Sequence, residues 1–539
     1  MRVIAWIDVD LFANGRGLTP RCLHDLAGLP VLARVVEGAL ACPSVREVAV
    51  TCPPRDRETV HAALAGLTCR VLGVEAPDVV NRALRRRARK WAGHSWRGGI
   101  SSTYLYDEEG NPGAMYAALV ALEASHALKL SPSGPFVDTA MVEAMIAQVQ
   151  TLPPNQDFCV SSAPPGLNYE VYGRTTAAKF AQGRDTIRTS LALKPGELMP
   201  DPTSFDFWHA LDVDVVACSA RLLVDSARGE ALVRGLVEAE GLGLLRAPAA
   251  EVVRALARRP GPSWWRLPEE VEVEVCSETA VAFDLRPVVR RDVPRMDLAT
   301  MEALADGLAG ADDVRWSFGG LGDPLLHTGL EDLIGAAKRK GAYGVHVATS
   351  GAAVTREAAA MLARSDVDVV TVELTAATPE GYARLHGDAS FAKAVAGVEA
   401  LLAEKRDGAP LVLVEWVKVK ELEGEFEAFH DHWAPKADGV VIRGACGYAG
   451  QVADRAVMHL LPGTRSVCER LQRRMSILPN GDVTLCEMDY LGRHAVGNVL
   501  RDRVEDLWRG RFEEVRLAHA RGEFGAHPLC SSCQEWGAL

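Results

Sequence analysis

The chain has 539 residues, of which 48% are hydrophobic and 24% are charged, and these values exclude a mostly disordered protein and predict two or three domains. The formal net charge of -12 excludes a general affinity for nucleic acid or an anionic membrane. No apolar run approaches the ~20 residues of a membrane span, and the first apolar run is interrupted by Asp8 and Asp10, which does not fit a secretory signal. Twelve cysteines without a secretory pattern fit a reducing compartment, so we expect a cytoplasmic protein.

Strands and helices alternate at the start of the chain. Apolar, β-branched runs predict strands at 3–9, 45–51 and 70–74, and the runs between them predict helices at 31–40 and 59–65. This alternation is typical of a parallel sheet covered by helices, so we expect an α/β domain. Gly15, Arg16 and Gly17 follow the first strand at its carboxyl end, where such folds bind ligands, although a plain turn explains the two glycines equally well.

This loop, the segment 25–34 and the Gly-Pro-Phe-Val-Asp motif at 134–138 together resemble the start of a nucleotidyltransferase or type-A glycosyltransferase. The resemblance implies a Rossmann-like domain of the nucleotide-diphospho-sugar transferase type over residues 1–245, with the Gly15, Arg16 and Gly17 loop around a nucleotide. Residues 21–25 lack the family's phosphate-binding lysine, however, and 131–134 lack its metal-binding aspartate. Because nucleotidyl transfer needs a cation to offset phosphate charge, these losses argue against that activity.

The most basic stretch of the chain lies at 82–97 and contains Trp91 and Trp96. Basic residues interleaved with aromatic ones can grip phosphate or stack on a base. On a chain with an excess of acidic residues, a solvated helix face whose tryptophans pack inward is the better interpretation.

Prolines and two tryptophans cluster at 246–270, which predicts a linker or a domain surface. The pattern then alternates again. Strands are predicted at 271–275, 313–318, 343–348, 367–374, 411–417 and 439–442, and helices at 297–308, 330–338, 356–363 and 391–402. Repeated βα units of this kind close into a full or partial barrel, which we expect over residues 271–450.

Several motifs in this region resemble those of radical S-adenosylmethionine (radical SAM) enzymes. The segment 317–326 resembles the Gly-x-Gly-Glu-Pro element that binds the amino group of S-adenosylmethionine, and 349–351 and 373–382 resemble the motifs after the third and fourth strands. The resemblance implies these cofactor-binding residues: Gly320, Gly322, Asp323, Pro324, Ser350 and Glu373. Glycines let the backbone approach a ligand closely, and an acidic side chain suits an ammonium group.

The family's reducing cluster is held by a Cys-x-x-x-Cys-x-x-Cys motif after the first barrel strand. Here Cys276 is followed at those spacings by Ala280 and Phe283, neither of which can bind iron. A single thiolate cannot hold the cluster, so we do not expect this chain to cleave S-adenosylmethionine, and whether it is an enzyme stays open. A degenerate pocket that still binds S-adenosylmethionine or another nucleoside remains an alternative.

Four cysteines mark the last part of the chain: Cys468, Cys486, Cys530 and Cys533. The segment 476–485 is an apolar run broken by Asn-Gly, the turn signal of a β-hairpin, and a helix is predicted through Val504 and Trp508. The closing Cys-x-x-Cys with two upstream thiols indicates a four-thiolate metal site. Spacing alone does not decide between a zinc ion and a 4Fe-4S cluster.

The order of these cysteines, the hairpin and the final helix resembles a SPASM domain, an auxiliary iron–sulfur module of radical SAM enzymes, here over residues 451–539. The resemblance implies a 4Fe-4S cluster on the four thiols. The combination of all three domains resembles the spirochaete-type proteins called spiro-SPASM.

The hypothesis from sequence is therefore an iron–sulfur protein with one auxiliary cluster that acts in the modification of a sugar, nucleotide or peptide. We expect a small-molecule or peptide substrate and an electron donor or partner enzyme. Two alternatives from other classes remain: a non-catalytic scaffold or zinc-binding protein, and a nucleotidyl or glycosyl transferase acting through the first domain.

Overall fold

The computed structural model describes the whole chain except residues 76–81, 89–90, 92–110, 154–155, 162, 183–207, 217, 219, 259–266, 388–389, 458–464, 466 and 537–539. The chain forms two compact units, one of residues 1–86 and 104–260, the other of residues 87–103 and 261–539. The division after residue 260 falls inside the predicted linker, but α10 (Ala249–Ala257) in that range is part of the first unit. No described helix combines the length and apolar character needed to cross a bilayer.

The first unit is built on a seven-stranded sheet in the order β5-β4-β1-β6-β8-β7-β9. The pairs among β5, β4, β1 and β6 are parallel, whereas β8 is antiparallel to both β6 and β7. The strands are β1 (Val3–Asp8), β4 (Val45–Cys52), β5 (Arg70–Gly73), β6 (His126–Leu130), β7 (Phe158–Ser161), β8 (Glu170–Gly173) and β9 (Trp208–His209). Besides α10, its helices include α1 (Val31–Leu40), α2 (Arg57–Ala63), α4 (Pro112–Ala121), α5 (Thr139–Thr151), α6 (Arg174–Gln182) and α9 (Ala227–Glu240).

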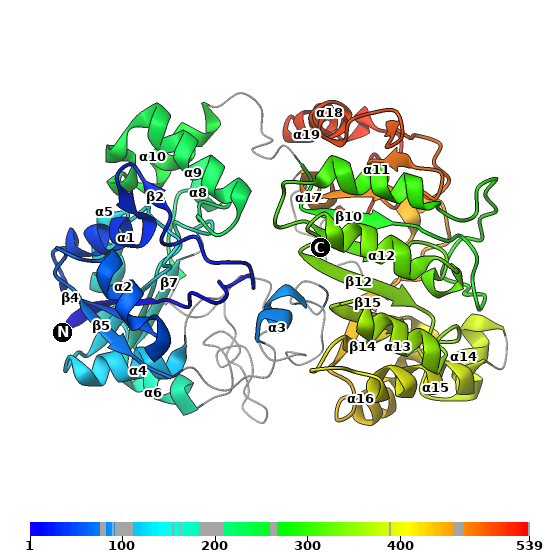
Figure 1. Cartoon of the computed structure of the whole chain (residues 1–539), viewed down its shortest axis with the longest axis horizontal. Helices are drawn as coiled ribbons and strands as arrows, with labels where there is room; N and C mark the ends of the chain where they lie inside the picture. The colour runs from blue at the N-terminus through cyan, green and yellow to red at the C-terminus, as the bar shows by residue number, and fades with distance from the viewer. Residues whose placement is uncertain are drawn as a thin grey trace. The chain divides into compact units, whose positions relative to one another are not determined.

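The second unit contains a nine-stranded sheet in the order β15-β14-β13-β12-β11-β10-β16-β17-β18. The strands β10 (Glu270–Val273), β11 (Arg315–Phe318), β12 (Gly344–Thr349), β13 (Val369–Glu373), β14 (Leu411–Lys418) and β15 (Gly439–Gly444) are all parallel. The intervening helices are α11 (Leu298–Leu308), α12 (Leu330–Arg339), α13 (Arg356–Arg364), α14 (Pro379–His386), α15 (Phe391–Ala403) and α16 (Phe426–Trp433). Figure 1 shows α11, α12, α13 and α15 along one face of this sheet, and the strand order stays open, as in a partial barrel.

The elements predicted in both halves are confirmed, with differences only at their ends, because each strand carries a strong apolar signal. In the second unit that signal alternates with polar residues. Val271 and Val273 pack in the hydrophobic core, whereas Glu272 between them lines a cavity. The same alternation places polar side chains of other strands in that cavity: Ser317, His346, Thr371, Glu415 and Ser476. Barrel interiors are usually packed with branched apolar side chains, so this polar lining predicts a ligand cavity.

The cysteine-rich segment continues the barrel sheet. β16 (Arg474–Ile477) pairs in parallel with β10, and β17 (Asp482–Thr484) returns antiparallel to β16 through the predicted Asn-Gly turn, where Gly481 has a φ of +83°. β18 (Gly497–Asn498) pairs with β17, and α17 (Glu469–Arg473), α18 (Val504–Arg509) and α19 (Arg511–Ala520) complete the segment. The sequence predicts the hairpin, but not its pairing with the first barrel strand.

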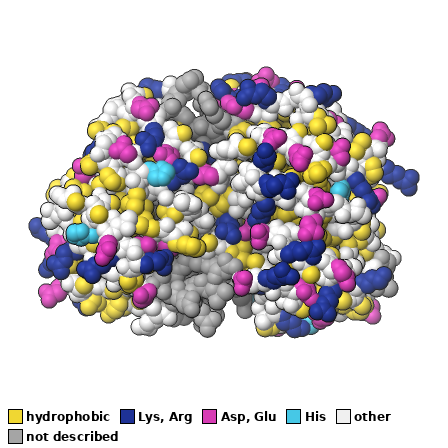
Figure 2. Space-filling view, viewed as in Figure 1, with side chains coloured by type: hydrophobic (Ala, Val, Ile, Leu, Met, Phe, Trp, Pro, Cys, Tyr) yellow, Lys and Arg dark blue, Asp and Glu magenta, His cyan; other side chains and the backbone are white. Residues whose placement is uncertain are grey.

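Acidic and basic side chains are interspersed over the face of the molecule drawn in Figure 2.

Candidate functional site

The four cysteines at the end of the chain line one cavity, here called the thiol cavity. Cys468 immediately precedes α17, Cys486 follows β17, and Cys530 and Cys533 come from the closing segment. The remaining wall includes the apolar side chains of Leu471, Leu485, Leu529 and Trp536. The fold therefore brings together all four thiols that the sequence predicts as metal ligands, from three separate parts of the chain.

Burial makes these thiols poor acids. It is the largest cause of the raised pKa of all four, and neighbouring thiols raise the pKa values of Cys486, Cys530 and Cys533 further. The pKa of Cys530 rises to about 12, and that of Cys486 lies well above its ordinary value. Four crowded thiols in an apolar wall ionise together only when a cationic centre offsets their charge, so the donor set fits a metal cofactor.

The spacing of these groups bears on the kind of metal centre. Among the described residues, no three His, Cys, Asp or Glu side chains lie close enough to hold a single metal ion. A tetrahedral zinc ion would need four sulfurs about 2.3 Å from one point. One cavity shared by four thiols fits a four-thiolate centre, which both a zinc ion and a 4Fe-4S cluster accept.

Two histidines that the sequence analysis did not identify also line the thiol cavity. His519 and His527 have exposed fractions of 2% and 4%, and both nitrogens of each ring have no hydrogen-bond partner among the described residues. Burial lowers the pKa of each imidazole to about 4, so both rings are neutral near pH 7 and each carries one N–H donor. Unpaired buried donors are costly, and cluster sulfurs would be acceptors for them. Isolated histidines carry no pattern that would have revealed this from sequence.

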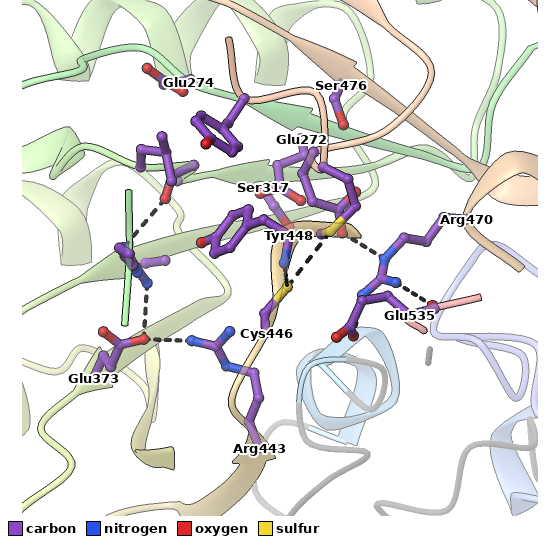
Figure 3. Close-up of a pocket in the computed structure, with 18 of the residues that line it drawn as sticks. Glu272, Glu274, Ser317, Glu373, Arg443, Cys446, Tyr448, Arg470, Ser476 and Glu535 are labelled. Atoms are coloured by element: carbon purple, nitrogen blue, oxygen red, sulfur yellow. Dashed lines mark hydrogen bonds and ion pairs between the residues drawn. The ribbon is translucent and has the colours of Figure 1, made fainter. Parts of the chain in front are cut away.

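A second, larger cavity of about 630 Å³, here called the barrel cavity, is lined by the polar side chains of the barrel strands and by residues of the cysteine-rich segment (Figure 3). Arg470 and Met488 line both cavities and so form a wall between them. Arg470 is fixed there by Glu487 at 2.6 Å, and Glu487 also accepts a hydrogen bond of 2.8 Å from Arg474. The thiol cavity is thus separated from the barrel cavity by single side chains.

A buried ion-pair network lies on the opposite side of the barrel cavity. Arg286 donates to Glu373 at 2.9 Å, and Arg443 donates to both Glu373 and Glu415, at 2.5 and 2.8 Å. Figure 3 shows the contact between Arg443 and Glu373. Burial acts to raise the pKa of Glu373, but the two guanidinium groups outweigh it and hold the pKa below its ordinary value. Burial raises the pKa of Glu415. The two carboxyl groups face each other in the register of β13 and β14, yet differ in acidity.

The residues predicted to bind S-adenosylmethionine do lie near one another, since Gly322, Asp323, Ser350 and Glu373 line one cavity wall. Their polar groups nevertheless have partners within the protein. One oxygen of Asp323 accepts hydrogen bonds from the Thr349 hydroxyl, the Ser350 amide and the Ser350 hydroxyl, at 2.9, 3.1 and 2.9 Å.

The remaining predicted residues are also engaged in the fold. The Gly320 carbonyl accepts a hydrogen bond of 3.3 Å from Arg286, which also pairs with Glu373. A Cβ atom on Gly322 would lie 1.9 Å from the Cys276 carbonyl oxygen, so only glycine allows this approach of two loops, and Pro324 begins a short 3₁₀ turn. Arg286 thus pairs with the Glu373 carboxylate and the Gly320 carbonyl, two of the residues that the resemblance assigned to the cofactor, and a site for S-adenosylmethionine on these residues stays a prediction.

The loop that would hold the reducing cluster is packed with aromatic side chains instead. Phe283 stacks on His386 with ring centroids 4.7 Å apart, and His386 stacks on Tyr382 at 3.9 Å. Cys276 is completely buried, and within the described residues no second group of thiols surrounds it. The aromatic stack forms one wall beside this loop, and the loop residues Ala280 and Phe283 line a cavity of about 480 Å³ with Gly322, Asp323 and Ser350.

In the first unit, the predicted nucleotide loop is a closed turn. The Asn14 side-chain oxygen accepts hydrogen bonds from the Arg16 and Leu18 amides, both at 3.0 Å, and Gly17 has a φ of +81°. Arg16 has an exposed fraction of only 3%. The arginine of this loop lies inside the fold, and a nucleotide site at Gly15, Arg16 and Gly17 stays a prediction.

Comparison with known proteins identifies the second unit. The model of the radical SAM superfamily matches residues 276–431, and that of SPASM, an iron–sulfur cluster-binding domain, matches residues 468–534. The chain contains a radical SAM domain followed by a SPASM domain. The SPASM match makes an iron–sulfur cluster the cofactor of the cysteine-rich segment, in agreement with the prediction from sequence.

The similar proteins include an uncharacterized protein of Treponema pallidum (strain Nichols), which is 29% identical to this chain over 228 residues. The match covers 40% of this chain and 62% of the Treponema protein, which is less than two thirds of the length of that protein. Solved structures of radical SAM enzymes are also similar. BtrN in complex with AdoMet and 2-DOIA is 20% identical, with a TM-score of 0.34 over 50% of this chain and 93% of that chain. Streptococcus suis SuiB bound to precursor peptide SuiA is 13% identical, with a TM-score of 0.41 over 53% and 73%. TM-scores this low assign no ligand or substrate to this chain.

Proposed function

We propose that this protein is a single-cluster iron–sulfur protein that binds a small polar ligand in its barrel cavity and serves in electron exchange with it or in its orientation, without cleaving S-adenosylmethionine. The observation that carries the proposal is the shared wall of Arg470 and Met488 between the thiol cavity and the barrel cavity. When bound, the cluster supplies a one-electron redox centre. The protein residues hold it, exclude water from it and separate it from the ligand.

The ligand chemistry follows from the lining of the barrel cavity. The carboxylates and guanidinium groups of this lining largely pair with one another. Their charges offset each other, so the cavity does not favour a ligand that carries a large net positive or negative charge. The Ser476 hydroxyl, with an exposed fraction of 4%, has no hydrogen-bond partner among the described residues and faces this cavity (Figure 3). A hydroxyl-rich or amide-rich molecule, such as a sugar, a nucleoside or a peptide, fits this lining. An external electron donor or partner enzyme would complete the system.

Anaerobic reconstitution tests the cluster and its ligands. The wild-type chain should bind about 4 iron atoms with matching sulfide and turn brown, as one cubane requires. The variants Cys486→Ser and Cys530→Ser should lose the iron and the absorption band. Cys276→Ala is the matched control, since this buried barrel thiol lies outside the thiol cavity and should leave the iron content unchanged. A colourless protein that retains one zinc ion on the same four cysteines would refute the proposal.

A second candidate function is a scaffold or binding protein without redox chemistry. It is favoured by the internal pairing of Asp323 and Glu373, which leaves the former cofactor residues with a structural role. Incubation of the reconstituted protein with dithionite and S-adenosylmethionine addresses both candidates. We expect no formation of 5′-deoxyadenosine and no heat of binding when S-adenosylmethionine is titrated in a calorimeter. A radical SAM enzyme with a complete three-cysteine motif, assayed in parallel, is the positive control. Formation of 5′-deoxyadenosine would contradict both readings of the barrel.

The two candidates differ in the redox behaviour of the cluster. A redox role requires that the reconstituted cluster be reduced and reoxidised reversibly in an electrochemical titration. A cluster that keeps the protein folded but cannot be cycled would favour the scaffold.

A further inference from the structure

Arg87 and Trp91 lie at the amino ends of the barrel strands β11, β12 and β13, from which they are remote in sequence. Both residues belong to the same compact unit as residues 261–539. Arg87 is in helix α3 (Arg82–Ala88) and Trp91 lies just beyond it, and both side chains contact the barrel.

Arg87 is held by a buried carboxylate. Its guanidinium donates two hydrogen bonds to one oxygen of Asp368, at 3.0 and 2.8 Å. Asp368 immediately precedes β13 and has an exposed fraction of 3%, and its other oxygen accepts from Lys338 and from the Val345 amide. A carboxylate this deeply buried and fully partnered fixes the position of Arg87.

Trp91 enters the barrel itself. Its indole N–H donates to the Ser317 hydroxyl at 3.0 Å, and its ring stacks on His346 with centroids 5.3 Å apart and planes 27° apart. His346 lies 3.3 Å from the Ser317 hydroxyl through Nδ1 and 2.9 Å from the Thr371 hydroxyl through Nε2. A hydrogen-bonded row therefore crosses three strands and begins at the indole. If the Ser317 hydroxyl donates onward, His346 carries its proton on Nε2.

The barrel is shaped to receive this ring. Gly344 is the first residue of β12, and a Cβ atom there would lie 3.0 and 3.3 Å from two carbon atoms of the Trp91 ring. Glycine inside a strand weakens it and often marks the close approach of another group. Here that group is the indole, which also lines the barrel cavity.

We propose that Arg87 and Trp91 form a built-in plug of the radical SAM barrel, in which Trp91 is the floor of the barrel cavity at the amino ends of the strands. Any ligand of the cavity then enters from the carboxyl ends of the strands and meets the indole at the far end. The first half of the sequence thereby contributes a specificity-determining side chain to the site of the second unit. The plug does not depend on the cluster or on the function proposed above.

Hydrogen–deuterium exchange of the full-length protein tests the plug. Trp91→Ala should increase amide exchange in β11 and the start of β12 by about tenfold or more, because local opening becomes easier without the ring. Trp91→Phe keeps a stacked ring and loses the N–H donor, so most of the protection should remain. Exchange in β1 and β4 of the first unit should not change, since these strands belong to the other compact unit.

A double-mutant cycle makes the test specific to the contact. In the wild-type background, Gly344→Val should strongly increase amide exchange in β12, because the valine side chain cannot occupy the same space as the indole. In the Trp91→Ala background the same substitution should increase this exchange only slightly. If Gly344→Val does not fold in the wild-type background, the cycle is measured with Gly344→Ala. The proposal is overturned if Trp91→Ala leaves exchange in β11 and β12 unchanged, or if the substitutions at Gly344 have the same effect in both backgrounds.

Discussion

Single residues decide what the radical SAM domain of this protein can still do. Ala280 and Phe283 replace two cluster ligands, and their effect is visible in the sequence because side chains without lone pairs cannot bind iron at any geometry. Arg286 is not identifiable in the same way. Arg286 pairs with Glu373 and the Gly320 carbonyl only because the fold brings the loop after β10 back across the ends of the strands. The same guanidinium would be an ordinary surface group in another fold.

The network around Glu373 gives a prediction for stability. Glu373→Gln leaves Arg286 and Arg443 without their shared carboxylate and should lower the free energy of unfolding by about 2–3 kcal/mol, less than for a fully buried pair because the arginines are 27% and 37% exposed. Glu415→Gln is the matched control. It should cost less, because burial raises the pKa of Glu415 and so favours its neutral form. Urea unfolding of the second unit measures both values.

The pH dependence of this network has a definite sign. The pKa of Glu373 is lowered in the fold, so its stabilising contribution is present above the pKa of the unfolded state and is lost as the pH falls through the folded value. The difference in stability between wild type and Glu373→Gln should therefore shrink toward acidic pH. A difference that grows on acidification would contradict this assignment.

At the scale of elements, the hairpin of β16 and β17 couples the SPASM domain to the barrel. β16 pairs with β10 and extends the barrel sheet, while β17 leads into Cys486. Local sequence predicts the hairpin, since Asn480-Gly481 between apolar runs is a strong turn signal. Pairing of β16 with a strand far earlier in the chain has no local signal, as the register of Glu270 with Arg474 shows. The fold thus places a cluster ligand directly beside the barrel cavity.

The turn of this hairpin gives a prediction at the same scale. Gly481 combines a φ of +83° with three neighbouring atoms that would lie 3.1–3.2 Å from an added Cβ atom, so Gly481→Ala should destabilise the second unit by about 1–2 kcal/mol and lower its iron content on reconstitution. Gly341→Ala is the matched control. Gly341 has a φ of +93° with open space around it, so only the backbone strain remains. Equal effects of the two substitutions on stability would contradict the packing argument.

At the scale of the whole molecule, the sequence by itself determined the order of the elements, the α/β class, the four closing cysteines and the absence of the three-cysteine motif after β10. These features depend on local apolar periodicity and on the chemistry of residues at fixed spacing, both of which are properties of the chain alone. Prolines indicated the division into two units near residue 260, but they did not distinguish α10 from a linker there.

The tertiary structure decided everything that needs residues remote in sequence to meet. His519 and His527 reach the thiol cavity, Arg286 reaches Glu373, and Trp91 from a stretch expected only to be basic and inward-packed stacks on His346. The physical reason is that such contacts depend on shape and charge complementarity between surfaces that the fold creates. No period or spacing along the chain encodes them, so they could not be predicted from the sequence alone.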